Sequence, residues 1–172
     1  MRYVAFLRGV NVGGRTIKMA DLKACFIEMN LDNVTTVLQS GNVIFDSSES
    51  LATLGRTIEA GLHQKFSYPA HVQVCALERL EEIINASPFD GSDPQMHSYV
   101  VFFEDALEKQ LAVEASDVNN ELECIKAGDG VIYWRTAKGS TLQSDFARYL
   151  TKSRYKNFHT NRNINTLRKI VS

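Results

Sequence analysis

The chain has 172 residues, of which 44% are hydrophobic and 23% are charged. This composition excludes a disordered chain and allows either one domain or two small domains with hydrophobic cores. The 19 lysine and arginine residues nearly balance the 20 aspartate and glutamate residues, giving a net charge of -1, which excludes a uniformly basic nucleic-acid-binding protein.

The first half of the sequence changes repeatedly between strand-like and helix-like patterns. Its first strand-like segment is a nearly continuous apolar run with aromatic and β-branched members, which is typical of a central strand. The predicted strands are residues 3–8, 33–39, 42–46 and 71–77, and the predicted helices are residues 18–29 and 51–66. The order is βαββαβ, that of the ferredoxin-like unit, whose usual sheet has its first and third strands in the centre.

A loop rich in proline, glycine, serine and aspartate, residues 86–97, predicts a domain boundary. We expect residues 1–86 to form a ferredoxin-like subdomain with a linking helix, and residues 98–172 to form a second one. Beyond the loop, the predicted strands are residues 98–104, 121–127 and 131–136, and the predicted helices are residues 107–115 and 142–150. The expected fold is therefore α+β, with two tandem ferredoxin-like (βαββαβ) subdomains. The second is expected to lack its last strand and to end in a helix.

Cysteine usage and hydropathy indicate the compartment. Cys25, Cys75 and Cys124 are an odd set at long spacings within apolar patterns, which predicts reduced, buried thiols. Arg8 interrupts the early apolar run, which is too short for a signal-peptide core, and no apolar stretch approaches the ~20 residues needed to cross a bilayer. We expect a cytoplasmic protein without a membrane partner.

A glycine-rich loop follows the first predicted strand, in the stretch LRGVNVGG. Because a βαβ crossover makes the first two strands parallel, their carboxyl ends share one sheet edge, so this loop and the hairpin at residues 39–42 must be neighbours. Glycine amides followed by a helix N-terminus favour anions. The predicted ligand-binding residues here are Arg8, Gly9, Asn11, Gly13, Gly14, Lys18, Gln39, Ser40, Gly41 and Asn42.

This loop matches no established phosphate-binding motif. The letters GVNVGG are neither GxGxxG nor a Walker A loop. The alternative is that the glycines only satisfy turn geometry and that Arg8 caps the sheet edge.

The C-terminal segment is strongly basic. After Asp145 it has seven lysine and arginine residues and no acidic residue. Tyr149, Tyr155 and Phe158 are interleaved with these cations, which suits stacking on single-stranded nucleic acid. The alternative is a solvated basic face whose aromatic residues point into the core.

A second anion site is predicted near the last helix. Thr160, Asn161 and Asn163 are candidate caps for this helix, and Arg162 lies beside its predicted N-terminus. Thr160, Arg162 and Asn163 are therefore also predicted ligand-binding residues.

Three segments together resemble a known family: LRGVNVGG with KMADLK, then VLQSGNVIF, then TNRNINTLRKI. They are similar to the signature segments of the small, mostly bacterial proteins grouped as domain of unknown function 1697, in the same order and over essentially the whole chain. The resemblance implies a duplicated ferredoxin-like architecture and a bacterial origin. It implies no activity and no catalytic residue, because the family has no established activity.

Other chemistries find little support in the sequence. His63, His71, His97 and His159 are scattered, without HxxxH or HExxH spacing, so we expect no dedicated metal site. Ser40 does not lie in a GxSxG elbow, and the aromatic motifs of RNA-recognition sheets are missing. No cofactor is expected.

The predicted central strands are apolar on both faces, whereas a solitary ferredoxin-like unit leaves one sheet face bare. The second subdomain or a second copy of the chain is expected to cover that face. We therefore expect a monomer or a homodimer.

Three interpretations of function follow. The leading one is binding of a phosphate-bearing small ligand, such as a nucleotide, at the glycine-rich loop and adjacent hairpin. The alternatives are single-stranded nucleic-acid binding through the basic C-terminal segment, and a protein interaction module without catalysis. The sequence does not decide whether the protein is an enzyme.

Overall fold

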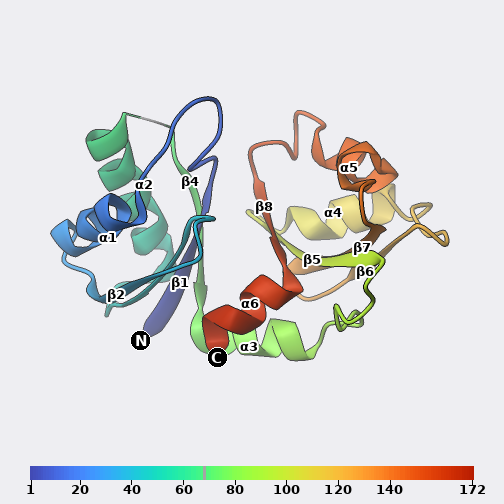
Figure 1. Ribbon diagram of the computed structural model, residues 1–172, viewed down its shortest axis with the longest axis horizontal. Coiled ribbons are helices and arrows are strands. Elements are labelled where there is room, and N and C mark those ends of the chain that lie inside the picture. Colours follow the sequence, from blue (N-terminus) through green and yellow to red (C-terminus); the bar gives the residue numbers. More distant parts are fainter. Residues whose placement is uncertain (68) are drawn as a thin grey trace. The chain divides into compact units, whose positions relative to one another are not determined.

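The structure, a computed structural model, describes residues 1–67 and 69–172. The chain divides into two compact units, Met1–Leu80 and Glu81–Ser172 (Figure 1). The predicted subdomain limits, residues 1–86 and 98–172, remain a prediction.

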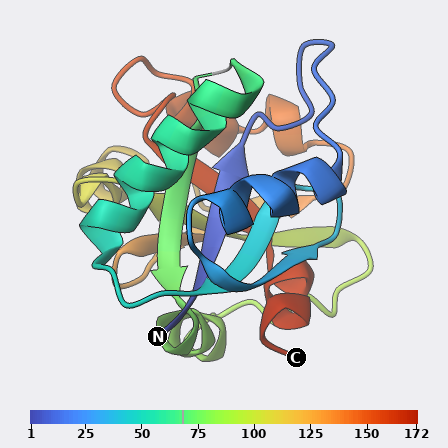
Figure 2. The same ribbon diagram turned by 90° about the vertical axis from the view of Figure 1, so that its left-hand side faces the viewer.

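The first unit has the predicted βαββαβ order. Its elements are β1 (Arg2–Arg8), α1 (Met19–Glu28), β2 (Asp32–Val37), β3 (Asn42–Asp46), α2 (Leu51–Phe66) and β4 (His71–Ala76). The sheet order is β2-β3-β1-β4, and all neighbouring strands are antiparallel. The first and third strands are therefore central, as predicted, and α1 and α2 cover one face of the sheet (Figure 2).

Side chains that alternate along β1 build the core beneath these helices. Tyr3, Ala5 and Leu7 belong to the same buried cluster as the apolar stripe of α2. Within this cluster the ring of Phe45 on β3 stacks on Tyr3 at 5.8 Å and meets the edge of Phe26 on α1 at 5.7 Å. Such aromatic pairs add to the stabilisation from buried apolar area.

The second unit repeats this topology. A helix, α3 (Leu77–Asn85), follows β4 directly and crosses the limit between the units. It is followed by β5 (Met96–Phe103), α4 (Leu107–Glu114), β6 (Glu123–Ala127), β7 (Val131–Ala137), the 3-10 helix η1 (Thr141–Gln143), α5 (Asp145–Leu150), β8 (His159–Asn163) and α6 (Ile164–Val171). The sheet order is β6-β7-β5-β8.

The prediction that the second subdomain lacks its last strand is wrong. Strand β8 pairs antiparallel with β5, from Phe103 opposite His159 to Tyr99 opposite Asn163. Its sequence, HTNRN, has no apolar alternation, so it carries no side-chain signal for a strand. Backbone hydrogen bonds to one neighbour are enough to hold this edge strand. The predicted C-terminal helix is confirmed as α6.

The three cysteines are free, but only one has the predicted burial. Cys25 is buried, whereas Cys75 and Cys124 are half-buried. Desolvation raises the pKa of Cys75 to about 11, so its thiol is protonated at neutral pH.

Among the described residues, no helix combines the length and the apolar character that a membrane span requires.

Asn163 caps α6. Its side-chain oxygen accepts a hydrogen bond from the backbone N–H of Asn165 at 2.9 Å. The cap fixes the residue at which the helix begins, and Ile164, Leu167 and Ile170 of this helix are buried.

We expect Asn163→Ala to lower the free energy of unfolding of the second unit by about 1 kcal/mol, because the cap is lost. Denaturant unfolding followed by the fluorescence of the single tryptophan, Trp134 of β7, measures this change. Asn161→Ala is the matched control, because Asn161 is exposed on β8. Equal losses in the two variants would contradict the capping role.

Candidate functional site

Two polar segments meet at one edge of the first sheet. The glycine loop (residues 9–18) joins β1 to α1, and the hairpin turn (residues 38–41) joins β2 to β3. The backbone N–H of Leu7 donates to the carbonyl oxygen of Gly41 at 2.8 Å. The side-chain amide of Asn11 donates to the carbonyl oxygen of Gln39 at 3.2 Å. The neighbourhood that chain topology predicts is therefore present, and the glycine loop extends beyond the end of the sheet (Figure 2).

The glycine loop is anchored at both ends and exposed in between. Val10 and Ile17 are 5% and 4% exposed and belong to the core beneath the helices. Asn11 ties the two anchors together, because its side-chain oxygen accepts a hydrogen bond from the backbone N–H of Ile17 at 3.0 Å. The tip of the loop, residues 12–14, is exposed.

The tip of the loop presents bare backbone. Gly13 and Gly14 have φ angles of 68° and 81°, and a Cβ atom at either position would meet nothing within 4 Å. Neither amide donates a hydrogen bond to another residue within the described chain. Both N–H groups are therefore available to an acceptor that approaches from solvent.

Positive charge flanks the bare backbone. Lys18 is exposed and occupies the N-cap position of α1, where no side chain accepts a hydrogen bond from the first turn. Arg8 ends β1 and is half-buried. Burial lowers the pKa of Arg8, but a guanidinium group stays protonated in proteins. The edge therefore combines cations with an N-terminus that has no side-chain cap.

Of the predicted hairpin residues, Gln39 and Ser40 are exposed, whereas Asn42 is fully buried. The side-chain amide of Asn42 donates to the carbonyl oxygen of Val37 at 3.1 Å and to the hydroxyl of Ser40 at 2.8 Å. These two bonds use both of its amide protons. Asn42 therefore holds the turn in shape, and its role as a ligand residue remains a prediction.

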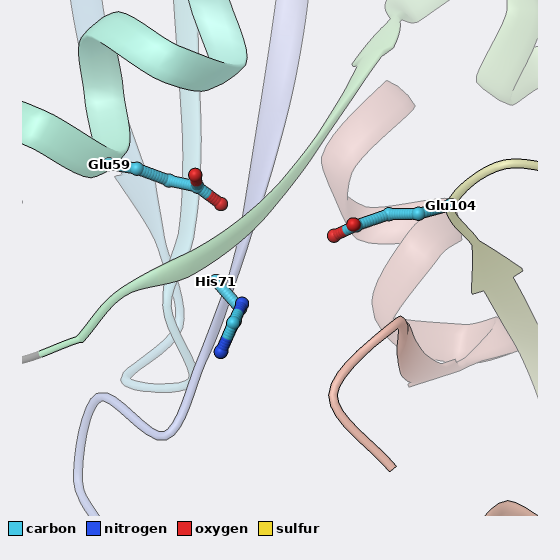
Figure 3. Close-up of side chains that lie close together, drawn as sticks. All are labelled: Glu59, His71 and Glu104. Atoms are coloured by element: carbon cyan, nitrogen blue, oxygen red, sulfur yellow. The ribbon is translucent and has the colours of Figure 1, made fainter. Parts of the chain in front are cut away.

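His71 was not among the predicted site residues, although it pairs with Arg8 across the sheet. Figure 3 shows it with Glu59 of α2, and ligand atoms of the two side chains lie within 4.8 Å. One carboxylate oxygen of Glu59 accepts a hydrogen bond from the backbone N–H of Val72 at 3.0 Å. The signal for His71 was its place at the start of β4, which runs antiparallel to β1. Two side chains fall short of the three or four protein ligands of a zinc site, and the expected lack of a dedicated metal site remains a prediction.

The second unit provides an internal comparison. Its equivalent of the glycine loop is residues 104–106, which are much shorter and include Glu104 and Asp105. Its equivalent hairpin turn is residues 128–130, around Asp129. In the second unit a short acidic connection thus joins the first strand to the first helix, so the fold does not require the long glycine loop.

The second predicted set, Thr160, Arg162 and Asn163, lies in the second unit. Arg162 donates from one guanidinium nitrogen to the hydroxyl of Thr160 at 2.8 Å and to the carbonyl oxygen of Asn161 at 2.9 Å. Burial lowers the pKa of Arg162 to about 10, so the group stays charged at neutral pH. These residues lie together, and each takes part in hydrogen bonds within its own unit.

The aromatic residues of the basic segment are mostly engaged. Tyr155 is fully buried, and the ammonium group of Lys152 lies 4.1 Å from the ring centroid of Tyr149. Phe158 is 38% exposed. Arg154 pairs with Glu114 at 3.0 Å. Only Phe158 of the three rings is thus presented to solvent in the manner of a stacking platform.

Comparison with known proteins identifies the family. The profile described as "Protein of unknown function (DUF1697)" matches residues 1–133. The chain belongs to this family. The resemblance that the signature segments indicated is therefore confirmed, and the DUF1697 description assigns no activity.

A solved bacterial structure has a similar fold. The conserved bacterial protein SP0830 from Streptococcus pneumoniae is 25% identical, with a TM-score of 0.81 over 99% of this chain and 96% of that chain. An unknown protein from Galdieria sulphuraria is 10% identical, and the alignment covers 94% of each chain with a TM-score of 0.22, which is too low to support any inference. No curated protein sequence matches the chain.

The turn beneath the glycine loop needs glycine for two reasons. Gly41 has a φ of 72°, and an added Cβ would lie 2.8 Å from Cγ2 of Val10 and 3.2 Å from the carbonyl oxygen of Leu7. Gly13 has a similar φ of 68° but open space around it.

We expect Gly41→Ala to lower the free energy of unfolding by about 2–4 kcal/mol, because backbone strain and overpacking both contribute. Gly13→Ala is the matched control and is expected to cost about 1–2 kcal/mol, because strain acts alone there. Denaturant unfolding followed by far-UV circular dichroism measures both. Equal losses would show that the turn does not press against Val10 and Leu7.

Proposed function

We propose that the protein binds a phosphate-bearing small ligand, such as a nucleotide, at the glycine loop and hairpin turn of the first unit. The observation that carries this proposal is the pair of exposed, unengaged amides at Gly13 and Gly14, in a loop whose base is bonded to the hairpin turn through Leu7 and Asn11. Successive backbone N–H groups in a turn can converge on an anion, as they do in phosphate-binding loops.

The electrostatics of the edge support the same ligand. Helix α1 has 10 residues and no side-chain cap at its start, so the positive end of its dipole faces the glycine loop. Lys18 and Arg8 add two cations, which suits a ligand that carries more than one negative charge. Asp21 in the first turn of α1 opposes this attraction, which favours a ligand held mainly at the loop rather than along the helix.

The comparison between the units also supports a role for the loop. Glycine weakens regular structure and adds conformational freedom to the unfolded chain. The second unit closes the same connection with residues 104–106, so the longer loop of the first unit is an addition to the fold. Exposed loops on a rigid sheet are common sites of binding.

The other interpretations have less support. Single-stranded nucleic acid would require exposed rings and unpaired cations, whereas Tyr155 is buried and Arg154 is ion-paired. None of the described contacts specifically favours a protein interaction module without catalysis. A cytoplasmic location and a monomeric or homodimeric state belong to the same proposal, and the three free cysteines support the first.

We expect pyrophosphate and ADP to raise the Tm of the first unit. At about one hundred times its Kd, a ligand adds about 2.7 kcal/mol of stability, which raises the Tm of a small domain by roughly 10–20 °C. Arg8→Ala is expected to remove this shift and Lys18→Gln to reduce it, each relative to the Tm of the same variant without ligand. Thermal unfolding followed by circular dichroism provides the measurement.

Lys23→Gln is the matched control, because Lys23 is an exposed lysine on the same helix, beyond its first turn. It is expected to keep the full shift. No shift across pyrophosphate, ADP and a broad nucleotide panel would overturn the proposal, as would equal effects of the two lysine variants. Binding of a labelled oligodeoxythymidine that weakens with salt and on Arg154→Ala would favour the nucleic-acid interpretation instead.

A further inference from the structure

The second unit contains a cavity of about 260 Å³ that is separate from the glycine loop. Its lining residues come from the end of the β6–β7 ladder and from the segment that leads into α5. Its polar lining includes Asn120, Glu123, Thr136, Gln143, Asp145 and Arg148. At roughly 30 Å³ for each water molecule in the liquid, it has room for a small metabolite.

Two buried residues that line this cavity, Glu123 and Thr136, are polar although they continue a row of hydrophobic core residues. On the core face of the ladder, Ile125 lies opposite Trp134, and the next pair in the same row is Glu123 opposite Thr136. Glu123 is 4% exposed and Thr136 is 1% exposed. A row of core side chains thus ends in a buried carboxylate and a buried hydroxyl.

The buried carboxylate is held firmly but keeps acceptor capacity. One oxygen of Glu123 accepts hydrogen bonds from the indole N–H of Trp134 at 2.9 Å and from the backbone N–H of Phe146 at 3.2 Å. The other oxygen accepts from the backbone N–H of Asp145 at 3.1 Å. A carboxylate offers about four lone-pair sites, so the second oxygen can accept another donor.

The hydroxyl of Thr136 gives an independent indication of a ligand. Its oxygen has no hydrogen-bond partner among the described residues, although the side chain lines the cavity. Burial of a polar group without a partner is unfavourable, and such groups in native proteins call for an explanation. A guest in the cavity that bonds both Glu123 and Thr136 supplies that explanation.

We propose that this cavity binds a small organic cation with a primary ammonium group. The charged residues of the lining are two carboxylates, Glu123 and Asp145, and one cation, Arg148, which is already ion-paired with Asp145. The lining therefore has a net negative charge. An ammonium group carries three donors and no acceptor, which matches a carboxylate oxygen with spare capacity and a hydroxyl that can accept. This site does not depend on the function proposed for the first unit.

The single tryptophan makes a direct test possible. Because the indole N–H of Trp134 is bonded to Glu123, its one ¹H–¹⁵N cross-peak reports on that carboxylate in the full chain. The probes are ethanolamine, ethylene glycol and glycolate, which share a hydroxyl group and differ in charge. Ionic strength is held constant with tetramethylammonium chloride. Ethanolamine is expected to shift the indole peak saturably with a Kd of about 1–10 mM, as suits so small a molecule, whereas the other two probes leave the peak unchanged.

Thr136→Val separates a ligand role from a structural one. The variant replaces the hydroxyl with a methyl group of similar size, so we expect an unchanged or higher Tm and a Kd for ethanolamine that is about tenfold higher. Thr166→Val on α6 is the control in the same unit and is expected to bind like the native protein.

Three results would overturn the proposal. The first is no saturable indole shift up to about 100 mM ethanolamine, far above the expected Kd. The second is an equal shift with ethylene glycol or glycolate, which would remove the preference for a cation. The third is unchanged ethanolamine binding by Thr136→Val.

Discussion

The hydrogen bond from the backbone of Leu7 to the carbonyl oxygen of Gly41 fixes where the glycine loop leaves the first sheet. Strand β1 is central, with β3 on one side and β4 on the other, so its carboxyl end has little freedom to move. The chain can pass beside the hairpin turn only because position 41 has no Cβ. Asn11 adds a second hydrogen bond between the glycine loop and the hairpin turn, to the carbonyl oxygen of Gln39. The place at which bare amides are presented is therefore set by the sheet itself.

The duplicated topology separates what the fold needs from what has been added to it. Both units use the sheet order in which the first and third strands are central, and both bury an apolar row against two helices. They differ at the ends of their strands. The first unit adds a long glycine loop with cations, whereas the second replaces the end of a core row with Glu123 and Thr136. Each unit thus combines a common framework with its own polar chemistry, as expected when sites are built on a shared fold.

The sequence predicted those features that depend on side-chain periodicity or on topology. The continuous apolar run of β1 and the stripe of α2 identified the layers of the first unit, and the crossover rule placed the glycine loop beside the hairpin. Strand β8 could not be predicted, because a polar edge strand is held by its backbone and leaves no apolar pattern. The inward orientation of Asn42 was equally invisible, because a sequence does not show that an amide will bond Val37 and Ser40. Buried polar residues such as Glu123 were missed for a related reason, since their partners come from distant parts of the chain.

If the first unit binds the proposed ligand, the uncapped start of α1 sets helix stability against ligand binding. A serine at position 18 would satisfy the first turn of the helix and stabilise it by about 1 kcal/mol, yet the chain has Lys18 there. A hydroxyl in that place would compete with any guest for the same donors. A gain in helix stability at this position would therefore come at the expense of the donors that the proposed ligand uses.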